Sequence, residues 1–187
     1  MRLIGLFVAL GAAAAPGLPA PPFASQIPSL APYLATPADV VERMLTLAKV
    51  GPRDVVYDLG CGDGRIVIMA AQKFGARGVG VDIDANLVKQ AQTQATAAGV
   101  SGQVRFLLQD AMTVDVSDAT VVTLYLLAAS NVKLRPILTK QLRPGARIVA
   151  HNFPIGDWNP DVVDNFRDAK GTARTLYLWT ADGVVRP

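Results

Sequence analysis

An apolar run that contains an acid and continues into alternating glycines is the part of this chain best suited to chemistry. Asp58 lies in the run 55–59, and the residues that follow are Gly60, Cys61, Gly62, Asp63 and Gly64. This order predicts a strand, a tight loop and a helix start, whose exposed backbone amides cradle a small cofactor. The dinucleotide fingerprint spaces its glycines as G-x-G-x-x-G, whereas this loop reads D-x-G-x-G-x-G. The spacing therefore predicts a different nucleoside cofactor.

Two further acids stand at the carboxyl ends of the next two predicted strands: Asp82 ends the second strand and Asp110 follows the third. Asp82 lies about 20 residues beyond the loop, where an acid hydrogen-bonds the ribose diol of a nucleoside. Asp110 is placed to hydrogen-bond an adenine amino group, and the neighbouring Ile83 and Ala111 complete this predicted cofactor-binding set. The alternative for each acid is an ordinary turn residue. Asp84 is expected to cap a helix rather than to bind a ligand.

Tyr125 and His151 are the candidate catalytic residues. Tyr125 lies near the end of the fourth predicted strand and His151 near the end of the fifth. Ligands of open α/β sheets bind beyond the carboxyl ends of the strands, so both side chains are expected at the same edge as the three acids. A structural histidine at a strand end is the alternative for His151.

The order of elements predicts a doubly wound α/β sheet. Thr36 is expected to cap a first helix that has Pro37 at its first position. Strands alternate with helices and end in two β-prone runs without a helix between them. The predicted strands are 55–59, 78–82, 104–108, 119–126, 147–152, 162–167 and 174–180, and the predicted helices after the first are 65–74, 84–98 and 131–142. This gives a Rossmann-like seven-stranded sheet of five parallel strands and a C-terminal antiparallel pair.

Composition limits the classes of function. A chain of 187 residues suggests one domain, and its net charge of +3 gives no basic cluster that indicates nucleic-acid binding. One Cys excludes an intramolecular disulfide, and one Cys with one His makes a zinc site unexpected. We therefore expect no metal and no nucleic-acid partner.

The N-terminus forms a separate, apolar segment. Met1 and Arg2 precede an apolar run to Ala15, and a Pro-rich stretch follows. We predict a signal peptide or membrane anchor over 1–20, a Pro-rich linker over 21–35 and the catalytic domain over 36–187. A cleaved signal implies export, whereas an uncleaved anchor implies a membrane-associated domain that faces the cytosol. The sequence leaves both open.

These motifs resemble class I S-adenosylmethionine (SAM) methyltransferases. The glycine loop matches motif I of that class. The segments 36–45, 58–67, 142–149 and 151–158 resemble the branch of archaeal broad-specificity protein lysine methyltransferases and mitochondrial enzymes that modify the c subunit of ATP synthase. The resemblance extends from about Tyr33 to Thr180. It implies SAM as cofactor and a lysine of a protein partner as acceptor.

The resemblance also implies roles for individual residues. Tyr33, Thr36 and Pro37 are expected to cover the methionine end of SAM. Asp58 is expected to hold its positively charged end, with help from Asp63, while Gly60, Gly62 and Gly64 let the backbone approach. Tyr125 stands where many class I enzymes carry an Asn-Pro-Pro-Tyr loop, but the Asn-Pro-Pro is absent here. That absence argues against the usual DNA-adenine and glutamine acceptors.

The sequence therefore predicts in-line transfer of a methyl group from SAM to a protein lysine. Two alternatives stay open, namely a methyltransferase for a small-molecule amine, thiol or hydroxyl, and a non-catalytic SAM-binding module.

Overall fold

The structure is a computed structural model that describes Leu30 and residues 33–187. The predicted signal or anchor over 1–20 and most of the predicted linker lie outside the described residues. No helix within the described part combines the length and the apolar character needed to cross a bilayer.

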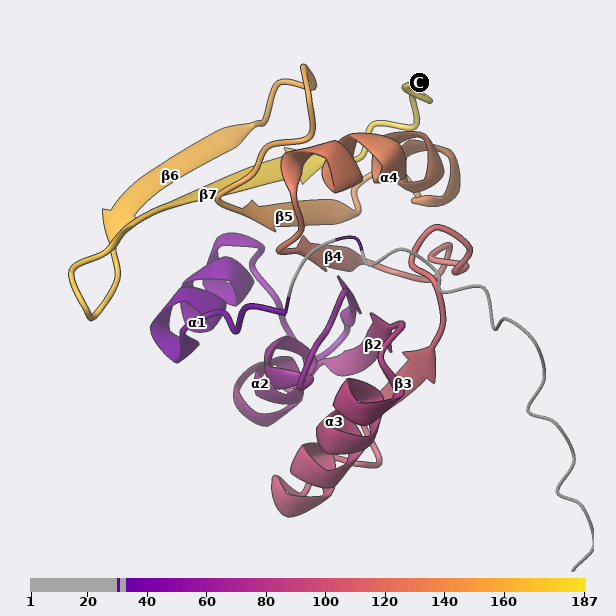
Figure 1. Ribbon diagram of the computed structural model, residues 1–187. Coiled ribbons are helices and arrows are strands. Elements are labelled where there is room, and N and C mark those ends of the chain that lie inside the picture. Colours follow the sequence, from indigo (N-terminus) through magenta and orange to yellow (C-terminus); the bar gives the residue numbers. More distant parts are fainter. Residues whose placement is uncertain (1–29, 31–32) are drawn as a thin grey trace, which may run out of the picture.

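A seven-stranded sheet forms the centre of the molecule (Figure 1). Its order is β3-β2-β1-β4-β5-β7-β6, with five parallel strands and β7 antiparallel to both β5 and β6. The strands are β1 (Val55–Leu59), β2 (Arg77–Asp82), β3 (Val104–Leu108), β4 (Val121–Leu124), β5 (Arg147–His151), β6 (Val162–Arg167) and β7 (Ala173–Thr180). The predicted fold class is confirmed, and the order reverses between β1 and β4, where ligands of such sheets bind.

Helices cover both faces of the sheet (Figure 1). The helices are α1 (Ala38–Leu47), α2 (Arg65–Phe74), α3 (Ala85–Ala97) and α4 (Ala128–Gln141). Along β1, Val56 packs in the cluster of α1 and α2, whereas Tyr57 and Leu59 pack with α4 on the other face. Because every residue of β1 is buried, the strand is apolar at almost every position instead of alternating.

Two helix starts differ from the sequence prediction. The N-cap of α1 is Pro37, whose carbonyl accepts the first helical bond from Val41, and no side chain caps this helix. Thr36 therefore does not cap α1; it is buried. Helix α4 begins three residues earlier than predicted, at Ala128. The predicted cap at Asp84 is confirmed, since its carboxylate accepts hydrogen bonds from the amides of Asn86 and Leu87.

The five parallel strands end at one edge of the sheet, and the β6–β7 hairpin extends past that edge. His151, the last residue of β5, pairs with Leu176, so residues 173–175 of β7 continue beyond it and pair with the end of β6. The carboxyl edge is therefore bordered by this hairpin on one side and by α3 on the other (Figure 1).

Candidate functional site

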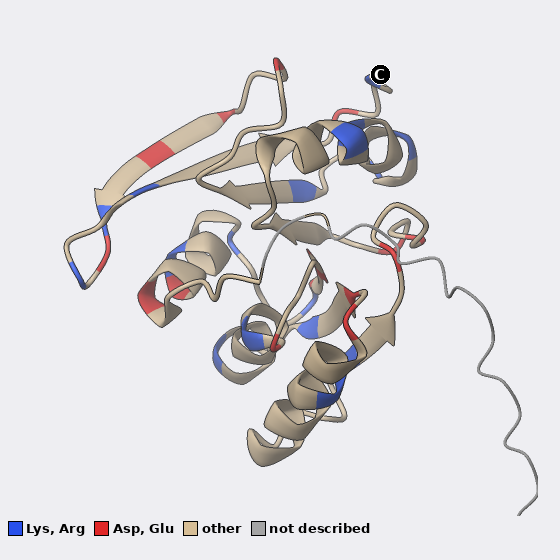
Figure 2. Ribbon diagram, in the orientation of Figure 1, with Lys and Arg blue, Asp and Glu red and all other residues tan. Residues whose placement is uncertain are grey.

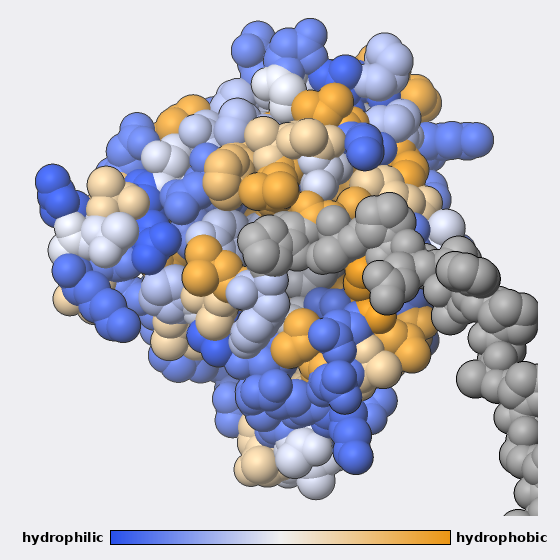
Figure 3. All heavy atoms as spheres, in the orientation of Figure 1, coloured by the Kyte–Doolittle hydropathy of each residue, from blue (hydrophilic) through white to orange (hydrophobic). Residues whose placement is uncertain are grey.

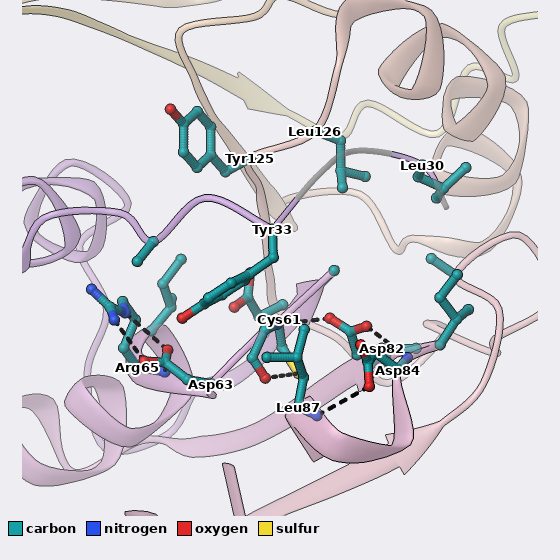
Figure 4. A pocket seen from close by; sticks show the side chains of 18 of the residues that line it. Leu30, Tyr33, Cys61, Asp63, Arg65, Asp82, Asp84, Leu87, Tyr125 and Leu126 are labelled. Atoms are coloured by element: carbon teal, nitrogen blue, oxygen red, sulfur yellow. Dashed lines mark hydrogen bonds and ion pairs between the residues drawn. The ribbon is translucent and has the colours of Figure 1, made fainter. Parts of the chain in front are cut away.

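A cavity of about 850 Å³ lies at the carboxyl edge, over the loop between β1 and α2 (Figure 4). Its walls come from the segment before α1, the ends of β1, β2 and β4, and the first turn of α3. The predicted site residues that line it are Tyr33, Thr36, Asp58, Gly60, Gly62, Asp63, Asp82, Ile83, Ala111 and Tyr125. Residues predicted from separate strands are thus brought to one place.

Four predicted residues do not line the cavity. Pro37 caps α1, and the Asp110 carboxylate accepts a hydrogen bond from the amide of Met112 within its own turn. Gly64 lies on the far side of the loop, where an added Cβ would meet Phe106 and Ala91. His151 lies behind Tyr125 and is completely buried.

Gly62 brings the backbone of the loop to the cavity surface. Its φ is +53°, and a Cβ at this position would stand 2.4 Å from Cε2 of Tyr33. Tyr33 lies over the loop, with Asp63 on one side of its ring and Asp82 on the other (Figure 4). A side chain at residue 62 would therefore displace Tyr33 from the cradle.

Asp82 ties the glycine loop to the end of β2. Its Oδ2 accepts a hydrogen bond from the amide of Gly62 at 2.8 Å, and its Oδ1 accepts one from the amide of Asp84 at 3.0 Å. A carboxylate oxygen offers two lone-pair sites, so each oxygen keeps one for a ligand. Asp82 lines the cavity, so these free positions are available to hydroxyl donors of a ligand.

Asp58 is a buried acid at the end of β1. Its Oδ1 accepts a hydrogen bond from Oγ1 of Thr123 at 2.8 Å. Burial raises the pKa of Asp58 to about 7, and the charges of Asp82 and Asp63 act in the same direction. A cation placed in the cavity would therefore stabilise the ionised form of this carboxyl group and lower its pKa.

Arg65 pairs with Asp63 and with the segment before α1, a role that the sequence did not reveal. Its Nε and Nη2 donate to the two oxygens of Asp63 at 2.9 and 2.6 Å, and its Nη1 donates to the carbonyl of Thr36 at 2.9 Å. Burial alone would raise the pKa of Asp63, but the hydrogen bonds and charge of Arg65 outweigh burial and lower it. Arg65 thus joins the start of α2 to the segment that covers the cavity.

Apolar side chains form the rest of the wall, and the sequence did not reveal these either. Leu87 lies in the first turn of α3, Leu126 follows β4, and Leu30 and Leu34 precede α1. The hydroxyl of Ser130 donates to the carbonyl of Leu30, which anchors this segment over the cavity. No periodicity marks Leu30, Leu34 and Leu126, because they precede a helix or follow a strand, and Leu87 lies in the first turn of α3.

Tyr125 stands at the edge of the cavity against two aromatic rings. Its ring centroid lies 4.0 Å from that of His151 and 6.5 Å from that of Phe153. Tyr33, Leu34 and Leu127 are exposed large side chains, and apolar side chains gather on this face of the molecule (Figure 3). Lys and Arg are distributed over α1, α2, α3 and α4 instead of along one face (Figure 2).

The residues present fit a nucleoside that carries a cationic tail. Asp82 could accept hydrogen bonds from a ribose, Ile83, Leu87 and Ala111 offer an apolar surface that suits a base, and the carboxyl groups of Asp58 and Asp63 suit a cationic tail. Within residues 33–187 and Leu30, no three metal-ligating side chains cluster.

Comparison with known proteins identifies the family. The model of the ANTKMT methyltransferase domain matches residues 58–162. A protein-lysine N-methyltransferase of Saccharolobus islandicus is 45% identical over 149 residues, which cover 79% of this chain and 92% of that protein. The adenine nucleotide translocase lysine N-methyltransferase of Mus musculus is 36% identical over 71% of this chain, which spans 57% of the mouse protein. A human lysine N-methyltransferase of the ATP synthase c subunit is 31% identical over 71% of this chain and 56% of its own length.

A solved structure supports the same assignment. The crystal structure of an RNA methyltransferase from Salinibacter ruber, in complex with S-adenosyl-L-homocysteine, is 52% identical. It superposes with a TM-score of 0.76 over 82% of this chain and 97% of that one. The glycine loop, Asp82 and most of the cavity lie within the range that the family model matches. The chain therefore belongs to the ANTKMT methyltransferase domain family and is a class I SAM-dependent methyltransferase.

Proposed function

We propose that this chain transfers a methyl group from SAM to the side-chain amine of a protein lysine. One observation carries the choice of acceptor. The chain is 45% identical to a protein named as a protein-lysine N-methyltransferase and covers 92% of its length. Little of that relative lies outside the shared region, so a separate acceptor domain is not needed to explain its activity.

The donor side of the reaction follows from the acids and the glycine loop. SAM supplies a methyl group on a cationic sulfur and leaves as S-adenosylhomocysteine. Asp82 would hold its ribose, and Asp58 and Asp63 would face its cationic amino-acid tail. Gly62 lets the backbone approach this tail, and Tyr33 covers it. These contacts position the donor, and positioning supplies much of the rate of an in-line displacement.

The acceptor side requires a neutral amine. A free lysine has a pKa of about 10.4, so deprotonation at pH 7 costs about 4–5 kcal/mol. Desolvation against the aromatic and apolar side chains of Tyr125, Leu126 and Leu34, which line the cavity, disfavours the ammonium form and lowers this cost. The ammonium group first gives one proton to solvent. Its nitrogen then forms the new N–C bond as the S–C bond breaks, S-adenosylhomocysteine leaves, and the positive charge passes from sulfur to nitrogen.

Incubation of the full chain with labelled SAM and a whole cell extract, with its small molecules retained, tests this proposal. We expect label in protein, acid-stable methyl-lysines after hydrolysis, and a marked decrease of both with Asp82→Ala when labelled SAM is kept below its dissociation constant. Because the Salinibacter structure is described as an RNA methyltransferase, RNA from the same extract is assayed separately. Label confined to RNA or to small molecules would refute the lysine acceptor while leaving the methyltransferase assignment intact.

The place of the enzyme in the cell is a second part of the proposal. The apolar run within residues 1–20 and the use of SAM in the cytosol support an anchor that holds the domain, 36–187, at the cytosolic side of a membrane. We expect the full chain in the membrane fraction and a chain without residues 1–20 in the soluble one. An exported form whose N-terminus begins after the apolar run would overturn this.

A further inference from the structure

Three aromatic side chains form one stack at the side of the cavity that Tyr125 lines, which we call the acceptor edge. Tyr125 follows β4 and lines the cavity, whereas His151 and Phe153 come from the end of β5 and the turn after it. The rings of Tyr125 and His151 are 4.0 Å apart with planes inclined by 30°, and those of Tyr125 and Phe153 are 6.5 Å apart. The ring that reaches the cavity is therefore backed by residues of the neighbouring strand.

The turn between His151 and Phe153 has an unusual backbone. Asn152 has a φ of +61°, a left-handed conformation that costs free energy for a residue other than glycine. Its amide donates to the carbonyl of Thr175 at 2.8 Å, and its Oδ1 accepts from the amide of Thr175 at 3.1 Å. Nδ2 of Asn131 donates to the carbonyl of Phe153 at 2.9 Å. Strand β7 and helix α4 thus hold the turn in this conformation.

His151 has the surroundings of a neutral ring. It is completely buried, and neither Nδ1 nor Nε2 has a hydrogen-bond partner among the described residues. Burial and, to a smaller extent, the charge of Arg174 on β7 lower the pKa of His151 to about 4, although Asp168 in the hairpin opposes this. A general base needs a partner within reach of its nitrogen, and His151 does not line the cavity.

We propose that His151 is a positioning residue that fixes the ring of Tyr125 at the acceptor edge by stacking and takes no proton during methyl transfer. Tyr125 is then the side chain that meets the acceptor. The uncharged stack also provides the low-polarity wall against which an amine gives up its proton. This inference goes beyond the proposed function, because the stack would position any acceptor that reaches Tyr125.

The first test uses the fact that the chain has a single histidine, so its imidazole signal in proton NMR is unambiguous. We expect the Cε1–H signal of the full chain to show no inflection above about pH 5.5, well below the ordinary histidine pKa of about 6.5. Tyr125→Leu should shift this signal by removing the ring current, whereas Phe166→Leu on β6 should leave it in place. A midpoint near pH 6.5, or a signal unmoved by Tyr125→Leu, would overturn the proposal.

The second test measures the total rate of label transfer from SAM into the macromolecules of a dialysed cell extract. His151→Ala should lower this rate at least about tenfold. His151→Phe should reach at least about a third of the rate of the natural chain, with an unchanged pH profile. Binding of S-adenosylhomocysteine, measured by calorimetry, should stay within about threefold in both variants. Val149→Ala is the matched control, since it opens a gap in the same buried strand but lies outside the aromatic stack.

The outcomes separate this inference from the proposed function. Label in RNA instead of protein refutes the lysine acceptor, yet the two His151 variants can still be compared by total label. If His151→Phe is as slow as His151→Ala, or if its pH profile differs from that of the natural chain, a ring nitrogen takes part and the inference is wrong. If His151→Ala does not fold, the histidine titration and the His151→Phe rate still decide between the two.

Discussion

The carboxylate of Asp82 accepts a hydrogen bond from the amide of Gly62 at 2.8 Å, across 20 residues of sequence. This contact joins the end of β2 to the loop after β1, and it fixes the backbone that lies beneath the cavity. The acid at the second strand end therefore has two functions. It shapes the glycine loop, and under the proposed function its remaining lone pairs would accept hydrogen bonds from the ribose of SAM.

Replacement of Asp82 by Ala should weaken binding of both SAM and S-adenosylhomocysteine. Each hydrogen bond to a charged group contributes about 1.5–3 kcal/mol, so the loss should be about ten- to hundredfold. Calorimetry with S-adenosylhomocysteine measures this directly. Asp115→Ala, which removes an exposed acid that does not line the cavity, is the control. Unchanged affinity in Asp82→Ala would remove the ribose assignment.

Gly62→Ala should weaken binding of S-adenosylhomocysteine, an effect that the strain of a left-handed backbone alone does not explain. Left-handed backbone costs a residue with a Cβ about 1–2 kcal/mol, and Gly99→Ala pays the same cost because its φ is +72°. At Gly99 nothing lies within 4 Å of the added Cβ, whereas at Gly62 the Cβ meets Tyr33.

Both glycine variants should therefore lose similar thermal stability, but Gly62→Ala alone should lose affinity for S-adenosylhomocysteine, by at least about tenfold. Equal affinities in the two variants would show that Tyr33 does not cover the ligand.

The fold was predictable because the strands carry their own signal. Val55–Leu59 and Val104–Leu108 are short apolar runs between turn residues, and both were predicted with the observed bounds. The start of α1 was not, because Pro37 has no amide hydrogen and its fixed φ suits a cap as well as a first helical residue. Thr36 is buried by tertiary packing, which the local sequence pattern does not predict.

The site was predictable where topology alone decides position. Asp58 and Asp82 end neighbouring parallel strands, so they must meet at one edge. Asp110 follows the next strand but does not line the cavity, and its Oδ1 accepts a hydrogen bond from the amide of Met112 in its own turn; its contact with an adenine amino group stays a prediction. Arg65 was missed because its partner carbonyl, on Thr36, lies 29 residues away and is brought close only by the folded chain.

Arg65→Gln should loosen the segment over the cavity. The variant leaves Asp63 without its cation and the carbonyl of Thr36 without its donor, so we expect affinity for S-adenosylhomocysteine to fall about fivefold, or about 1 kcal/mol. Arg43→Gln is a matched control, because Arg43 also donates two hydrogen bonds to one carboxylate, that of Asp164, outside this cavity. A loss of affinity as large in the control would assign the effect to general destabilisation.

Asp58→Asn should change the dependence of stability on pH. As pH rises from about 4 to about 7, the unfolded chain loses this proton while the folded chain keeps it, because burial raises the pKa of Asp58 to about 7. The folded state therefore binds more protons, and its free energy of unfolding falls by at most about 4 kcal/mol across this window. The asparagine variant, which can still accept the hydrogen bond of Thr123, lacks this fall.

In denaturant titrations, the unfolding free energy of the variant minus that of the natural chain should thus increase from pH 5 to pH 8. His151 acts oppositely, since its lowered pKa makes acidification destabilising, but it is present in both proteins and cancels in the difference. A difference that is constant with pH would contradict a raised pKa of Asp58. In the natural chain, ionisation of Asp58 should also strengthen binding of S-adenosylhomocysteine from pH 6 to pH 8, and the variant should show weaker binding without this rise.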